Sequence, residues 1–182
     1  MATAHFEPAN VSGVGIVFGI FAALVCHIML NLLGLGLGLT TADANADPQA
    51  VRWGAFALWA VAGIISAFVG GAVAGWMAGA VDGSPGFHGL ATWTITTVIV
   101  VGAASYIATA GTAVGMMAGP SFAVSAREGV TPAEAEAAAN AAGPLALASF
   151  VALVIGAIAA YYGAHMAAQR ETRLYPHTQQ RI

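Results

Sequence analysis

Four long apolar stretches constrain the fold of this chain more than any other feature. They cover about residues 13–39, 48–79, 88–119 and 145–168. A helix needs ~20 apolar residues to cross ~30 Å of hydrocarbon, so each stretch is long enough to span a bilayer. Inside a membrane only helices and closed barrels satisfy their own backbone hydrogen bonds. The sequence therefore predicts an all-α bundle of four transmembrane helices, with residues 1–182 forming one domain.

The composition supports a membrane location and excludes one class of partner. Hydrophobic residues make up 59% of the chain and charged residues only 7%, whereas soluble domains carry about a quarter charged residues. So few charges cannot cover a water-facing surface, and we expect membrane lipids to surround the protein. The five cationic residues and the net charge of −3 form no basic patch, which excludes a nucleic-acid partner.

The gaps between the apolar stretches carry signals of loops and helix ends. Asp47 and Pro48 are typical of an N-cap followed by the first position of a helix. The third gap, residues 120–143, is acidic and contains a Thr-Pro-Ala-Glu capping signal. We expect a short extramembrane helix within this gap. Gly143 and Pro144 are expected to separate it from the fourth membrane helix.

The arginines predict the orientation of the bundle. With an even number of spans, both termini lie on the same side of the membrane. The tail, residues 169–182, holds Arg170, Arg173 and Arg181, whereas the loops on the other side hold Arg52, Arg127 and most of the acidic residues. Because arginine and lysine are enriched in cytoplasmic segments, we expect both termini to be cytoplasmic.

Two of the predicted helices repeat a small residue at every fourth position. The positions are Gly63, Ala67, Gly71, Gly75 and Gly79 in the second helix, and Ala152, Gly156, Ala160 and Ala164 in the fourth. Helices associate in lipid through close packing of such residues. Two series of this length exceed what a bundle of four helices uses, so we expect one to contact another subunit or a second copy. The alternative is that both series pack within the bundle.

Four polar residues are candidate ligands of a cofactor. His27 lies deep in the first helix with Asn31 one turn later, and together they can bind a quinone or relay protons; the alternative is a neutral pair that only stiffens packing. His88 and His165 lie at similar depth in the third and fourth helices, where two histidines can ligate a haem or a metal ion. Their alternative is contact with interfacial water. No other metal site is predicted.

Hydroxyl residues are concentrated on the third helix. They are Thr92, Thr94, Thr96, Thr97, Ser105, Tyr106, Thr109 and Thr112. Such hydroxyls either line a polar path or bond back to carbonyls of their own helix or across to a neighbouring helix. Because they fall on several faces and not on one stripe, we favour the second interpretation.

Several short motifs resemble a known family. They are Asn31-Leu-Leu-Gly-Leu-Gly-Leu-Gly-Leu-Thr40, Gly70-Gly71-x-x-Ala74-Gly75, Asp82-Gly83 and His88-Gly89-Leu90-x-Thr92-Trp93. Over about residues 15–115 the chain is similar to small bacterial membrane proteins of four helices, often labelled "PhnA-like". The resemblance implies the fold and a location in the bacterial inner membrane. It implies no activity, cofactor or site residue.

No motif in the sequence indicates catalysis, so we expect a protein that is not an enzyme. The favoured function is an accessory or structural subunit that packs against a larger membrane complex of respiratory or photosynthetic type, because charge-poor helices offer packing surfaces and little chemistry. One alternative is a small homo-oligomeric channel or transporter. A second is a redox protein that binds haem or quinone through the histidines.

Overall fold

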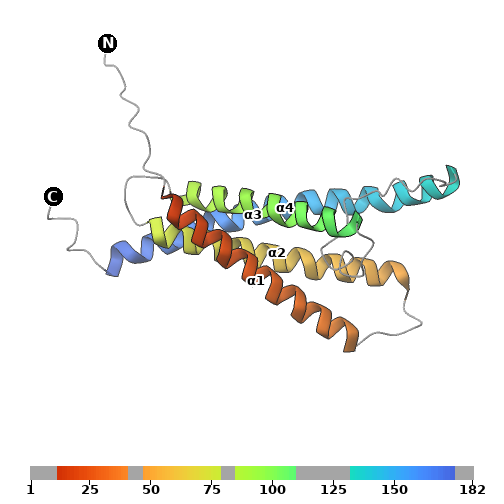
Figure 1. Cartoon of the computed structure of the whole chain (residues 1–182), viewed down its shortest axis with the longest axis horizontal. Helices are drawn as coiled ribbons and strands as arrows, with labels where there is room; N and C mark the ends of the chain where they lie inside the picture. The colour runs from red at the N-terminus through yellow and green to blue at the C-terminus, as the bar shows by residue number, and fades with distance from the viewer. Residues whose placement is uncertain (1–11, 41–46, 79–84, 110–131, 175–182) are drawn as a thin grey trace, which may run out of the picture.

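The computed structural model describes residues 12–40, 47–78, 85–109 and 132–174, and all of these except Ser12 and Asp47 are helical. The helices are α1 (Gly13–Thr40), α2 (Pro48–Ala78), α3 (Pro85–Thr109) and α4 (Pro132–Leu174) (Figure 1). Each contains a segment long and apolar enough to cross a membrane. The prediction of an all-α bundle of four membrane helices is confirmed, and the chain is a multi-pass membrane protein.

The fourth helix differs from the sequence prediction. α4 is continuous over 43 residues and Pro144 lies inside it, so the predicted break at Gly143 and Pro144 is wrong, and residues 132–143 form the first turns of α4. An interior proline removes only one helical hydrogen bond. The alanine-rich run before it has high helix propensity, and Pro144 is exposed where the membrane span, Gly143–Arg170, begins. The third helix starts at Pro85, and its predicted end near 119 lies outside the described residues.

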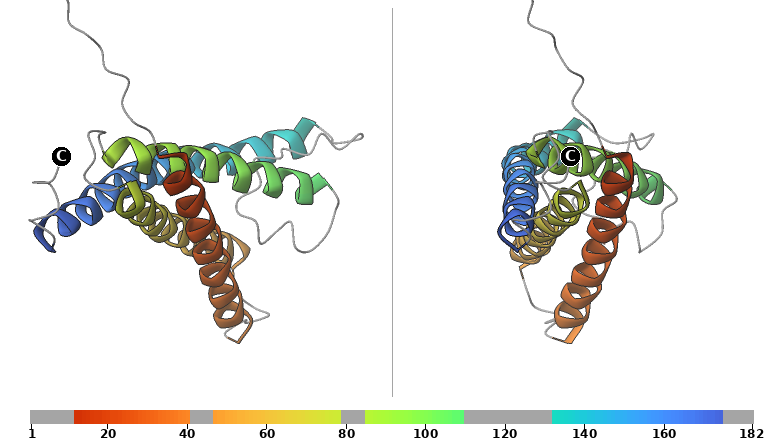
Figure 2. Two further views of the ribbon diagram at one scale, coloured as in Figure 1. Left: turned by 60° about the vertical axis from the view of Figure 1, so that its left-hand side comes forward. Right: turned by 90° about the vertical axis from the view of Figure 1, so that its left-hand side faces the viewer.

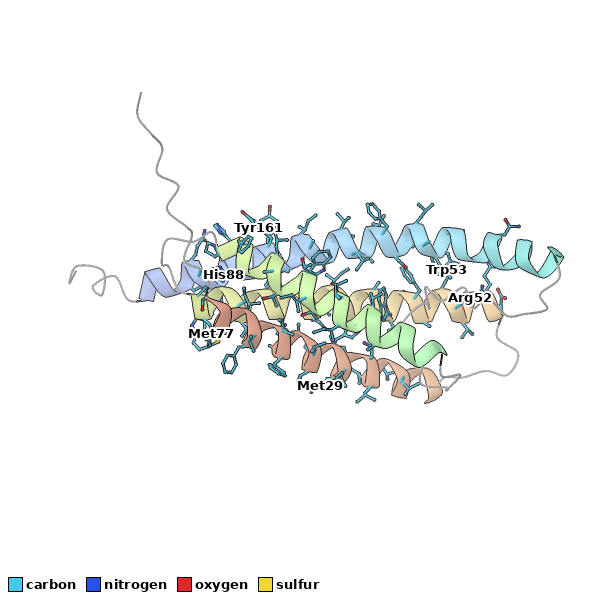
Figure 3. The ribbon with its side chains drawn as sticks, turned by 45° about the horizontal axis from the view of Figure 1, so that its top comes forward. Met29, Arg52, Trp53, Met77, His88 and Tyr161 are labelled. Carbon is cyan, nitrogen blue, oxygen red and sulfur yellow. The ribbon has the colours of Figure 1, made fainter. Side chains whose placement is uncertain are left out.

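α2 is the central helix of the bundle. It contacts the other three helices and packs most extensively on α4, whereas α1 and α4 scarcely touch. α1 starts and α4 finishes at the same end of the bundle, and α1 diverges from the other helices toward Thr40 (Figures 1 and 2). Met77, His88 and Tyr161 lie at the end where α1 starts, and Arg52 and Trp53 lie toward the opposite end (Figure 3).

Glycine and alanine bring the backbones together at the end where α1 starts. Gly71 and Gly75 of α2 lie directly on the backbone of Ala160 and Ala164 of α4, so that a Cβ at either glycine would overlap a carbonyl group. Where α1 crosses α2, a Cβ added at Gly19 would lie 2.7 Å from the carbonyl oxygen of Gly70. We call this region, built around Gly15, Gly19, Gly70, Gly71, Gly75, Gly86, Gly89 and Gly163, the closed end.

At the closed end, the small-residue series of α2 and α4 pack against each other. The positions around Gly71, Gly75, Ala160 and Ala164 face one another inside the chain. At these positions the structure follows the alternative in which the series pack within the bundle, because α2 and α4 are the most extensively packed pair. Gly79 lies outside the described residues. The surface that remains exposed on all four helices is mainly large apolar side chains, such as Phe21, Val98 and Leu147, which suit contact with lipid.

Candidate functional site

A partly enclosed pocket of about 60 Å³ lies between all four helices. Its lining comprises Ala23, His27, Trp59, Ala60, Gly63, Ile64, Ser66, Ala67, Thr92, Trp93, Thr96, Thr97, Val100, Val101, Ala152, Leu153 and Gly156. His27, Gly63 and Thr96 each fall near the middle of their helix. Gly156 falls near the middle of the span Gly143–Arg170. The pocket therefore lies near the middle of the bilayer.

The small residues that close the bundle at one end leave space at this level. A Cβ added at Gly63 would meet nothing within 4 Å, whereas one at Gly71, two turns further along α2, would overlap Ala160. Across the pocket, the indole nitrogen of Trp93 lies over Gly156, 3.1 Å from the position of an added Cβ. The pocket thus forms where α2 presents a glycine that no neighbouring backbone covers.

Three polar atoms of the pocket residues have no hydrogen-bond partner among the described residues. They are Trp59 Nε1, Thr92 Oγ1 and Thr96 Oγ1, and each atom is buried. The Trp59 side chain is 9% exposed and that of Thr92 only 1%. An unsatisfied buried polar group costs about 1–3 kcal/mol, and native proteins contain few of them. A cluster of three around one pocket therefore calls for an explanation.

Other hydroxyls in the bundle are satisfied within their own helices. Ser66, Thr94 and Ser149 each donate to the carbonyl four residues earlier, at 2.6, 2.9 and 2.7 Å respectively. This is the usual arrangement for a hydroxyl in a membrane helix. The prediction that hydroxyls of the third helix bond back to their own carbonyls is therefore correct for Thr94 and wrong for Thr92 and Thr96.

Packing explains the orientation of Thr92. Its methyl carbon lies at the crossing of α1 and α2, 3.0 Å from where a Cβ would stand at Gly19 and 3.4 Å from one at Gly70. With the methyl group held there, the hydroxyl occupies a different staggered position, turned away from the crossing. The close approach of two glycines thus holds the Thr92 hydroxyl where it has no partner.

His27 contributes to the pocket from α1, as its depth in the sequence suggested. Its ring hydrogen-bonds the backbone carbonyl of Ala62, which also accepts from the Ser66 hydroxyl. A neutral imidazole that donates from one nitrogen leaves the other as an acceptor. Asn31 does not join the site: its amide donates to the His27 carbonyl at 2.8 Å, and it does not line the pocket.

The structure gives His88 and His165 separate partners. His88 is 2% exposed, and its Nε2 accepts from the backbone N–H of Ser12 at 3.0 Å. Its Nδ1 is buried without a partner among the described residues. The His165 ring hydrogen-bonds Gln169 of its own helix at 2.8 Å and stacks on Tyr161. Because the Nε2 atoms of both histidines are engaged in this way, the arrangement does not fit a haem iron shared between them.

Sequence reasoning missed the indole of Trp59. A signal for it exists, because tryptophans of membrane proteins concentrate at the interfaces, where Trp53 and Trp76 lie near the two ends of α2. Trp59 instead lies inside the apolar helix, where its N–H needs a partner. In the part of the chain that the structure describes, no group of three or more His, Cys, Asp or Glu side chains could hold a metal ion.

Comparison with known proteins yields no match among protein families, curated proteins or solved structures. The resemblance to the "PhnA-like" group therefore stays a prediction, and the function is argued from the pocket alone.

Proposed function

We propose that this chain is a membrane-embedded binding protein that holds a small uncharged molecule between its four helices. One observation carries the proposal: Trp59, Thr92 and Thr96 all line the same pocket, and each has a buried polar atom without a partner among the described residues. Hydrocarbon outside the bundle offers these atoms no hydrogen bonds. A bound molecule would satisfy all three at once.

The lining determines what kind of molecule fits. Among the described residues, no Asp, Glu, Lys or Arg lines the pocket, so a charged ligand would be buried without a counter-charge, which is costly at this depth. The remaining lining is apolar apart from His27, Ser66, Thr97 and the indole nitrogen of Trp93. A mostly apolar cavity with a few convergent polar groups is typical of small-molecule sites.

The test is to identify what the purified protein carries. The protein is transferred from membranes into lipid nanodiscs without prolonged detergent washing, and its small molecules are extracted and identified by mass spectrometry. We expect one species in stoichiometric amount with the wild type, reduced in Trp59→Phe and in Thr92→Val. Thr94→Val is the matched control, since its hydroxyl is satisfied by Leu90 and lies outside the pocket. Equal extracts from all four proteins would contradict the proposal.

The accessory-subunit function stays a prediction. Its main support in the sequence is that charge-poor helices offer packing surfaces and little chemistry. Of the two small-residue series, which add to that support, the closed end uses Gly71, Gly75, Ala160 and Ala164 within the chain. The nanodisc preparation also bears on this alternative, because a tightly packed partner subunit would co-purify. Copies of the chain around an open axis would instead favour the channel.

We further propose a bacterial inner-membrane location with both termini in the cytoplasm. The support is that α1 starts and α4 finishes at the same end of the bundle (Figure 1), together with the arginines of the tail. Single cysteines at Thr131 and Thr178, in a Cys26→Ala background, test the orientation in intact cells. An impermeant maleimide is expected to label position 131 and not 178. The reverse pattern would invert the orientation.

A further inference from the structure

We infer that the molecule held in this pocket is lipid-soluble and enters with a hydrogen-bond-accepting oxygen of the carbonyl type. The inference rests on the proposed binding function and assigns its ligand chemistry. It begins with Trp59, whose indole N–H can only donate and has no acceptor among the described residues. An oxygen of a pocket ligand that reaches Trp59 Nε1 would supply the acceptor that this atom lacks.

The two threonines add hydroxyls that can donate or accept on one side of the pocket. Thr92 and Thr96 lie one turn apart on α3, so they share a helix face. A carbonyl oxygen has two lone pairs and can accept from Trp59 and from one hydroxyl together. His27, bonded to Ala62, supplies a single acceptor nitrogen. The threonine hydroxyls can donate or accept, so they suit either kind of ligand group, and it is the Trp59 indole, which can only donate, that favours an accepting oxygen.

The size of the pocket limits how much of the ligand it encloses. About 60 Å³ is several times the ~10–15 Å³ that one water needs, but far below the ~300–1,000 Å³ of a site that encloses a drug-sized molecule. That volume admits a carbonyl group and the carbon atoms next to it. The remainder of a longer molecule has to leave through the open side of the pocket. A methyl ketone with an alkyl tail is the simplest probe that has this shape.

The experiment titrates 2-undecanone into the protein in lipid nanodiscs, with undecane as the matched probe that lacks the oxygen. The chain has four tryptophans, so ¹⁵N labelling of the indoles yields four N–H resonances that Trp→Phe variants assign. We expect the Trp59 resonance to shift and saturate with the ketone and not with the alkane. Trp76, which is 60% exposed outside the pocket, is expected not to shift.

The variants connect the shift to the pocket. Thr92→Val, followed at the Trp59 resonance, and Trp59→Phe, followed at the resonance of Trp93, which also lines the pocket, are each expected to weaken ketone binding about 2- to 12-fold, the range for one net hydrogen bond. Thr94→Val, two residues after Thr92 on the same helix, is expected to bind the ketone like the wild type. Binding that is unchanged in both pocket variants would overturn the inference.

The remaining outcomes separate this inference from the proposed function. If undecane binds as tightly as the ketone at Trp59, the accepting oxygen is wrong and the binding function stands. If neither probe binds and native extracts are empty, only water fills the pocket, and both the inference and the function fall. If all four indole resonances move in parallel, the ketone has merely partitioned into the lipid, which also overturns the inference.

Discussion

Gly63 and Gly71 lie on the same helix, two turns apart, yet they do opposite things. Gly71 lets the backbone of Ala160 press against α2, whereas Gly63 has nothing within 4 Å of the position of an added Cβ and borders the pocket. The closed end and the pocket are therefore built from the same residue type. The difference teaches that a regular series of small residues does not mark one continuous interface. What each position does depends on how near the facing helix approaches.

The polar groups of the two regions also differ. At the closed end, His88 receives the backbone N–H of Ser12, whose hydroxyl in turn accepts from Gly15 at the start of α1. One nitrogen of His88 is left unpartnered there among the described residues. Around the pocket, three residues that line one open volume each have a buried polar atom without a partner in the described part of the chain. This grouping, together with the space, distinguishes a binding site from a local packing compromise.

The largest expected effect comes from filling the closed end. Gly71→Leu would place a side chain where the Ala160 backbone lies, so α2 and α4 must separate. We expect a loss of about 3 kcal/mol in stability, measured by thermal unfolding in a fixed detergent. The matched control is Gly54→Leu on the same helix, where an added Cβ meets nothing within 4 Å. Equal losses in the two variants would show that the closed end is no tighter than the rest of α2.

A smaller loss is expected at the start of α1. His88→Leu removes the acceptor of the Ser12 N–H, leaving a donor unpaired at a partly buried position, and we expect a cost of about 1 kcal/mol. His165→Leu is the comparison, because His165 bonds only along its own helix, to Gln169, in the contact described. Its effect in the same unfolding assay should be clearly smaller. A larger loss of stability for His165→Leu would contradict the expectation that the hydrogen bond from Ser12 to His88 contributes more to stability than the contact of His165 with Gln169.

Removing an unpartnered hydroxyl from the pocket is expected to raise the stability of the protein, whereas the two changes above lower it. Thr92→Val keeps the shape of the side chain and removes a hydroxyl that has no partner, so the ligand-free protein should gain about 1 kcal/mol. Thr94→Val removes a satisfied hydroxyl and should cost about 0.5–1 kcal/mol. Both variants are unfolded after removal of any bound ligand, so that the change in unfolding free energy reports only on the protein's own hydrogen bonds. A loss at position 92 as large as that at position 94 would show that the Thr92 hydroxyl has a partner.

The smallest effect is expected in the diverging half of α1. Gly36 has nothing within 4 Å of an added Cβ, so Gly36→Ala should stabilise the helix by about 0.5 kcal/mol through propensity alone. The unfolding assay and size-exclusion chromatography report on stability and assembly together. A marked loss in either would reveal that another chain packs closely on this half of α1.

Much of the fold follows from the sequence, because the length of an apolar run is what the bilayer selects. The starts of α1 and α2 at Gly13 and Pro48 agree with prediction. The continuity of α4 through Pro144 does not, since one lost hydrogen bond is outweighed by a strongly helical context. Of the residues that line the pocket, His27 could be identified from the sequence, because it lies deep within the first apolar stretch. The convergence of Trp59 and Thr92 could not, because it depends on how α2 and α3 rotate against their neighbours.

The most direct test of the central claim is an experimental density map of the protein in lipid nanodiscs, at a resolution that separates water from a bound organic molecule. The account predicts non-protein density in the pocket, larger than one water, with an atom within hydrogen-bond distance of Trp59 Nε1 and of Thr92 or Thr96. A pocket that is collapsed, with these three side chains bonded to protein groups, would contradict it. So would a pocket that contains only isolated waters.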